Sequence, residues 1–142
     1  MRGRGQVVFT AAVVVVVVAA VAGGLFLLGS PAQERIRRID GQRVSDLSAM
    51  AGAVDLYWTR HTRLPASLEE LAAEPGAYVK RGDPVTQRPY EYRAREGNAY
   101  ELCAAFDRES TASQPGGYYY RDFWAHGAGR QCFKLEAQEI KR

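Results

Sequence analysis

An apolar stretch near the start of the chain constrains everything that follows it. Val7–Leu28 holds twenty-two residues without a charged side chain. As an α-helix it would extend about 33 Å, and the hydrocarbon core of a bilayer is about 30 Å thick. The sequence therefore predicts a transmembrane helix at 7–28, preceded by a short N-terminus at 1–6. The side chains that we expect to anchor it in lipid are those of Val13, Val14, Val15, Val16, Val17 and Val18.

Two other interpretations of this stretch stay open. A secretory signal peptide has an apolar region of about 7 to 15 residues followed by small residues at a cleavage site, and Ser30-Pro31-Ala32 is a candidate for such a site. A buried core helix is the second alternative. The apolar run here is longer than that of a signal peptide, which favours an uncleaved span. About 110 residues follow it, enough for one domain.

The two cysteines indicate where that domain lies. An even number of cysteines in a small domain behind an apolar N-terminal segment is typical of a disulfide formed in an oxidising compartment, here between Cys103 and Cys132. Two separate buried thiols are the alternative. Arginines flank the apolar stretch on both sides, so the positive-inside rule alone leaves the orientation open. With the disulfide, we expect a single-pass protein of a bacterial inner membrane, with 1–6 cytoplasmic and 29–136 periplasmic.

Charge and motif content exclude several classes of function. Apart from two arginines before the apolar stretch, seventeen Lys and Arg residues stand against sixteen Asp and Glu, without a basic run, so we expect no nucleic-acid partner. No phosphate-binding glycine loop, haem-attachment motif or zinc motif occurs. His61 and His126 lie outside recognised nucleophile motifs. We therefore expect no catalytic residues, metal, cofactor or small-molecule substrate.

A long amphipathic helix should follow the apolar stretch. From Glu34 to about Thr62 the apolar residues recur with a period of 3.6, and Leu64-Pro65 should end the helix. We expect these apolar side chains to face the core: Ile36, Ile39, Val44, Leu47, Met50 or Ala51, Val54, Tyr57 and Trp58. We expect these polar ones to face solvent: Arg35, Arg38, Gln42, Asp46 and Arg60.

The remainder predicts one short helix and a small sheet. Ser67 stands three residues before Glu70, as in a capping box, and predicts a helix at about 68–73. Alternation at 90–95 and an aromatic-rich run at 100–106 predict a hairpin. A third strand at 131–135, placed beside the second, would bring Cys132 to Cys103. The fold class is thus α+β, with the long helix packed on about three antiparallel strands and a charged, frayed tail at 137–142.

Several motifs in this order resemble type IV pilins, especially the major pseudopilin of type II secretion. They are Asp46-Leu47, Ala53-Val54 and Tyr57, then Leu64-Pro65-Ala66-Ser67-Leu68, then Asp83-Pro84 and Pro89-Tyr90-Glu91-Tyr92. The resemblance covers roughly 40–106. It implies a long N-terminal helix, half anchor and half packing surface for a small antiparallel sheet, in a protein that assembles with others.

The N-terminus departs from the pattern of that family. Its members carry a processing site in which Gly precedes Phe-Thr-Leu-x-Glu, whereas here Phe9-Thr10 is followed by alanine and valine, and no acidic residue precedes Glu34. Processing and filament assembly are therefore not carried over. The calcium ligands of the secretion pseudopilins are not mapped onto Asp107 or Asp122 either.

An aromatic cluster offers the best candidate for a partner-binding surface. Its members are Tyr118, Tyr119, Tyr120, Phe123 and Trp124. Aromatic residues are enriched at interfaces, although these could instead cover the sheet or the helix. We expect a structural or assembly subunit whose partners are membrane lipid and other subunits of a membrane complex. A membrane-tethered binding or sensor module that uses 118–124 is the alternative.

Overall fold

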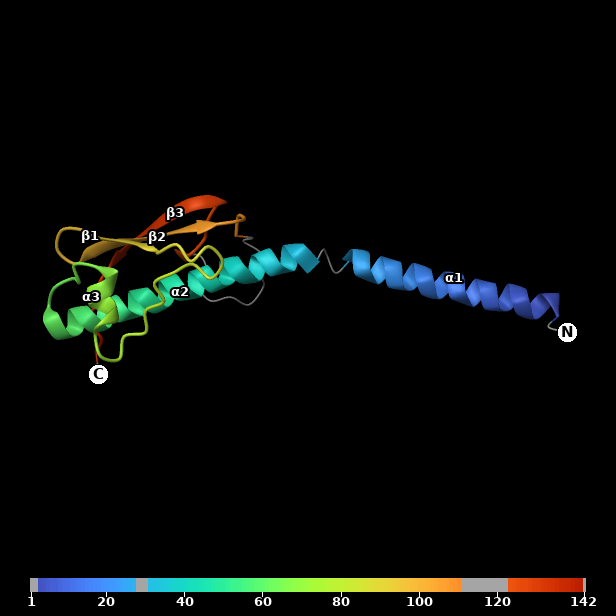
Figure 1. Ribbon diagram of the computed structural model, residues 1–142, viewed down its shortest axis with the longest axis horizontal. Coiled ribbons are helices and arrows are strands. Elements are labelled where there is room, and N and C mark those ends of the chain that lie inside the picture. The colour runs from blue at the N-terminus through green and yellow to red at the C-terminus, as the bar shows by residue number, and fades with distance from the viewer. Residues whose placement is uncertain (1–2, 28–30, 111–122, 142) are drawn as a thin grey trace. The chain divides into compact units, whose positions relative to one another are not determined.

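The computed structural model describes residues 3–27, 31–110 and 123–141 (Figure 1). The chain divides into two compact units, 1–35 and 36–142, which are described separately. Helix α1 spans Arg4–Leu27, α2 spans Pro31–His61 and α3 spans Leu68–Ala72. Strands β1, β2 and β3 span Glu91–Ala94, Ala99–Phe106 and Gly129–Glu136. This is an α+β chain with a three-stranded antiparallel sheet, as the sequence predicts.

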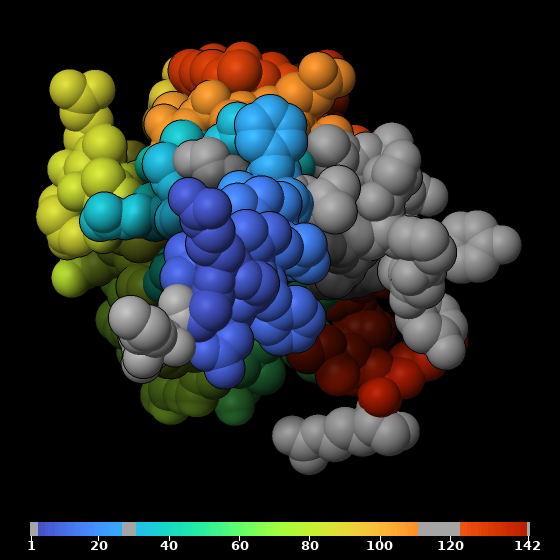
Figure 2. Space-filling view, turned by 90° about the vertical axis from the view of Figure 1, so that its right-hand side faces the viewer, coloured from blue at the N-terminus to red at the C-terminus, as the bar shows by residue number. Residues whose placement is uncertain are grey.

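Helix α1 carries the apolar stretch and begins three residues before Val7. Its length and composition meet the requirements of a membrane span, which a signal sequence or the core helix of a soluble protein would also meet. Figure 2 shows its side chains, in blue, at the surface, and Phe9 and Val15 are 72% and 66% exposed. A helix that displays so much apolar area in water is unfavourable, so α1 needs an apolar environment.

Helix α2 is the single long helix that the apolar periodicity predicts. Leu47, Met50 and Val54 are fully buried and Tyr57 is 3% exposed, and together they form one stripe along the helix. The expected solvent-facing arginines are exposed, but the expectation for Asp46 is wrong. Asp46 is 7% exposed because it lies on the packed face, where its carboxylate accepts a 2.9 Å hydrogen bond from the Tyr90 hydroxyl.

Helix α3 begins at the capping motif. Ser67 is its N-cap, and the Ser67 hydroxyl accepts a hydrogen bond from the Glu70 backbone N–H at 3.2 Å. The Glu70 carboxylate reaches back to the N–H of Ala66, one residue before the cap, and also accepts from the Tyr57 hydroxyl. Through Tyr57 the capping residue ties α3 to the end of α2.

The three strands are ordered β1-β2-β3, and each neighbouring pair is antiparallel. Side chains alternate between the two faces, so Tyr100, Leu102 and Phe106 of β2 belong to the same buried cluster as the α2 stripe. Phe133 of β3 joins them. Figure 1 shows the sheet lying along α2, and the buried cluster between them is the hydrophobic core of the second unit.

The end of the chain corrects one expectation. The residues after β3, as far as residue 140, are not frayed, because they form hydrogen bonds with two other elements. Ala137 is 2% exposed and exchanges two hydrogen bonds with Asn98, in the turn between β1 and β2. The N–H of Gln138 donates to Asp55, and the N–H of Ile140 donates to the Thr59 hydroxyl, both on α2.

A substitution at Ala137 tests this docked tail. Ala137→Asp places an unpaired charge at a buried site, and we expect the free energy of unfolding to fall by about 2 to 3 kcal/mol. Glu139→Gln, two residues further on and exposed, is the control and should change it by less than about 0.5 kcal/mol. Urea unfolding followed by circular dichroism gives both values. If neither substitution changes the free energy of unfolding appreciably, the tail is frayed.

Candidate functional site

An ion cluster centred on a buried arginine joins three segments of the second unit. Arg43 of α2 is 3% exposed, and its guanidinium contacts carboxylates from all three segments. Its Nε donates to Asp83 at 2.5 Å, and one terminal nitrogen donates to both Asp40 and Asp107 at 2.7 Å. Asp40 lies on α2, Asp83 in the loop before β1, and Asp107 directly after β2. One side chain thus holds the helix, the loop and the end of the central strand.

Asp83 also organises its own loop. Its Oδ1 accepts hydrogen bonds from the N–H groups of Val85 and Thr86, at 2.9 and 2.7 Å. Burial alone would raise the pKa of Asp83, but the hydrogen bond from Arg43 and those two N–H groups outweigh it and hold the pKa below its usual range. Burial likewise opposes the charge on Arg43, yet its three carboxylate partners raise the pKa of Arg43 above the ordinary value.

Asp40 fixes the end of the central strand. Its two carboxylate oxygens accept hydrogen bonds from the backbone N–H groups of Asp107 and Arg108, each at 3.0 Å. These donors come directly after β2, where the sheet ladder no longer pairs them. The cluster therefore provides hydrogen-bond partners for backbone as well as side-chain groups. Buried polar groups require such partners.

Sequence reasoning missed this cluster, although a signal for it is present. The buried stripe of α2 runs Asp40, Arg43, Leu47, Met50, Val54, Tyr57, with alternating steps of three and four residues. That spacing keeps residues on one helix face whatever their polarity. Reading only the apolar members places Ile39 and Val44 on the core-facing stripe and leaves Asp40 and Arg43 unassigned.

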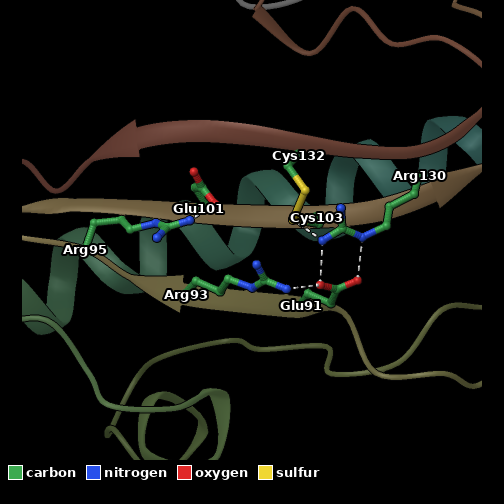
Figure 3. The surroundings of a disulfide bond; sticks show 7 residues. All are labelled: Glu91, Arg93, Arg95, Glu101, Cys103, Arg130 and Cys132. Carbon is green, nitrogen blue, oxygen red and sulfur yellow. Dashed lines mark hydrogen bonds and ion pairs between the residues drawn. A yellow bond between two sulfur atoms is a disulfide. The ribbon is translucent and has the colours of Figure 1, made fainter.

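The disulfide lies on the outer face of the sheet. Cys103 of β2 and Cys132 of β3 are direct cross-strand partners and form the disulfide expected from the cysteine count. Cys103 is 1% exposed, whereas Cys132 is open to solvent. In Figure 3 Arg130 extends toward Cys103, and its Nη2 lies 3.5 Å from the Cys103 sulfur.

Ion pairs cover the rest of that face (Figure 3). Arg130 donates two hydrogen bonds to the Glu91 carboxylate of β1 in a bidentate contact, at 2.8 and 2.7 Å. Arg93 donates to the same carboxylate at 3.3 Å. The hydrogen bond between Arg130 and Glu91 lowers the pKa of Glu91 and raises the pKa of Arg130. Further along, Arg95 pairs with Glu101 at 2.8 Å. The outer face is thus polar and carries both signs of charge around one disulfide.

A groove runs between α2 and the edge of the sheet. It has a volume of about 1180 Å3. Small and apolar residues make up about half of its lining, and these charged residues also line it: Asp55, Arg95, Glu101, Lys134 and Glu136. The principal apolar and small members are Ala51, Gly52, Phe123, Trp124 and Leu135. Such a mixture suits a segment of protein chain better than a small polar ligand.

The aromatic cluster is only partly described. Tyr118, Tyr119 and Tyr120 lie outside the described residues. Phe123 is 48% exposed and lines the groove, as an interface residue would. Trp124 is 4% exposed, and its ring packs edge-on against that of Phe133, with the ring centroids 4.8 Å apart. For Trp124 the structure supports the alternative that the ring covers the sheet.

The two histidines have partners within the fold. His61 Nε2 lies 2.8 Å from the Glu74 carboxylate, beside Arg60, which binds the same group. His126 is 9% exposed and stacks on Phe106 with ring centroids 3.6 Å apart. Within residues 3–27, 31–110 and 123–141, no group of three or more His, Cys, Asp or Glu side chains is arranged to hold a metal ion.

Comparisons with family models, curated proteins and solved structures find no match to this chain.

Removal of the central cation tests the ion cluster. Arg43→Met leaves three carboxylates near one another without a cation, and we expect the free energy of unfolding to fall by about 3 to 5 kcal/mol. Arg38→Met, on the exposed side of the same helix, is the matched control and should cost less than about 0.5 kcal/mol. Urea unfolding of both variants measures the difference, and equal costs would contradict a central role for Arg43.

Acid should weaken the same cluster. The pKa of Asp83 is lowered in the folded state, so its contribution to stability is complete above the unfolded value of about 4 and is lost as the pH falls towards the folded value. Asp83→Asn lacks this titration. We expect the stability gap between the wild type and Asp83→Asn to be largest near pH 7 and to narrow steadily below about pH 4. A gap that stays constant down to pH 2 would contradict the assignment.

Proposed function

We propose that this protein is a non-enzymatic structural or assembly subunit, held in a bacterial inner membrane by α1. Its periplasmic, pilin-like domain would contact other subunits of a pseudopilus-like or other multi-subunit membrane complex. One combination of features carries the proposal. The chain has an apolar, exposed 24-residue helix, and the domain after it is disulfide-bonded and has a groove along its long helix.

Support for the membrane assignment comes from α1. Its six consecutive valines are all exposed, so their apolar surface is open to lipid or to other membrane helices. The disulfide supports the orientation, because such bonds persist in the periplasm and are rare in the cytosol. An N-terminus in the cytoplasm and a domain outside satisfy both observations.

Support for an assembly role comes from the second unit. The long helix α2 supplies one wall of the groove with Ser48, Ala51 and Gly52, whose small side chains let another chain approach closely. Phe123 provides a half-exposed aromatic ring on the groove, and aromatic anchors of this kind dominate many protein interfaces. A long helix packed on a small antiparallel sheet is also what the pilin resemblance implies.

A membrane-tethered binding or sensor module is the second candidate. Both candidates use the aromatic cluster at 118–124, of which Trp124 is buried against the sheet, but only the assembly role also uses the groove along α2. Phe123 is the one member of that cluster that the described residues place at an accessible position. We therefore favour the assembly subunit.

Photocrosslinking in membranes tests the assembly role. A photoreactive phenylalanine at Phe123 should give light-dependent adducts with other membrane proteins, because this position lines the groove. The matched control is the same residue at Tyr78, an aromatic position that is 75% exposed and does not line the groove. Adducts at 123 and none at 78 support the proposal. A chain without adducts at either position, migrating alone after mild detergent extraction, would refute it.

A further inference from the structure

We propose that the Cys103–Cys132 disulfide is a site of thiol–disulfide exchange, at which an external dithiol attacks Cys132 and Cys103 leaves. The inference is independent of the assembly role, because it depends on the outer face of the sheet alone. Three features carry it: the unequal exposure of the two sulfur-bearing residues, the arginine placed beside one of them, and the contacts that hold β3 without the bridge.

Unequal exposure selects the sulfur that is attacked. Exchange begins when a thiolate attacks one sulfur of a disulfide, and access decides which one. Cys103 lies on the central strand and is 1% exposed, whereas Cys132 lies on the edge strand and is open to solvent. An incoming thiolate therefore reaches Cys132, which makes Cys103 the leaving group.

Arg130 stabilises that leaving group. A thiolate leaves faster when a neighbouring cation lowers the pKa of its thiol. The Nη2 of Arg130 lies 3.5 Å from the Cys103 sulfur, close enough to donate to the developing negative charge. The same nitrogen donates to Glu91 at 2.7 Å, so the carboxylate positions the guanidinium while offsetting part of its charge. Figure 3 shows Arg130 bridging the carboxylate and the sulfur.

The chemical steps balance with a dithiol as the co-reactant. The first thiolate of the dithiol forms a bond to Cys132 Sγ, the S–S bond breaks, and its electron pair leaves on Cys103 Sγ beside Arg130. The second thiolate of the dithiol then attacks its own sulfur in the mixed disulfide and releases Cys132 as a thiolate. The dithiol becomes a disulfide, and both cysteines of the protein are reduced.

The folded domain keeps β3 in place when the bridge opens. β3 is paired with β2 along its whole length, and Phe133 of β3 lies in the core. Directly after β3, Ala137 is bonded to Asn98. These contacts do not depend on the disulfide, so exchange takes place on the folded domain and does not require unfolding.

The first test uses the unaltered full-length chain in detergent micelles. Reduced glutathione, a monothiol, has no second thiol for intramolecular release, so rapid alkylation of the released thiol traps the mixed disulfide before a second glutathione or the freed cysteine attacks it. Peptide mass spectrometry should find glutathione on Cys132 and the alkyl group on Cys103, in excess over the reverse by at least about tenfold. Equal amounts of the two products, or glutathione mainly on Cys103, would overturn the proposal.

The second test separates Arg130 from the general charge of the sheet. Arg130→Gln should slow reduction by dithiothreitol by about three- to tenfold. Arg93→Gln is the matched control, since Arg93 is similarly exposed and contacts the same Glu91 carboxylate, and it should leave the rate unchanged. Equal slowing in both variants would instead show simple attraction of the anionic reagent. Reduction that proceeds only at the rate of global unfolding would also overturn the proposal.

Discussion

A positive charge inside the fold dictates how the second unit is put together. The Arg43 guanidinium is almost fully buried, so it must be met by carboxylates, and those carboxylates come from three segments that are far apart in the sequence. A buried ion pair adds little net stability compared with apolar packing, because desolvation offsets most of the attraction. Its value here is alignment, since the loop at Asp83 and the end of β2 meet α2 at one position along the helix. The apolar stripe on the same face of α2 supplies the buried apolar surface.

The sheet separates two kinds of chemistry. Its inner face, with Tyr100 and Leu102, completes the core against α2. Its outer face carries the disulfide under Arg130 and Glu91, in contact with water. Packing and reactivity therefore do not compete, because a change at the outer face leaves the core contacts of the same strands intact. The groove beside α2 is a further surface, lined in part by Glu101 and Lys134 of the outer face.

Much of this fold follows from local patterns. Apolar periodicity predicts α2, and the Ser67 cap predicts α3. Alternation and an aromatic-rich run predict the first two strands, and the cysteine count predicts the disulfide that a third strand beside the second would allow. The missed features depend on tertiary contacts. Arg43 is charged, and its burial becomes reasonable only when Asp83 is known to lie beside it. The tail is held through backbone N–H groups, which have no side-chain signature, and Trp124 turns inward because Phe133 provides a surface for its ring.

The most direct test of the central claim, a domain held outside the membrane by α1, is labelling from one side. Tyr78 is 75% exposed, and both native cysteines are paired, so Tyr78→Cys introduces a single accessible thiol in the folded chain. A membrane-impermeant maleimide added to intact bacterial spheroplasts should label this thiol to the same extent before and after lysis. Labelling that appears only after lysis would place the domain in the cytoplasm and contradict the account.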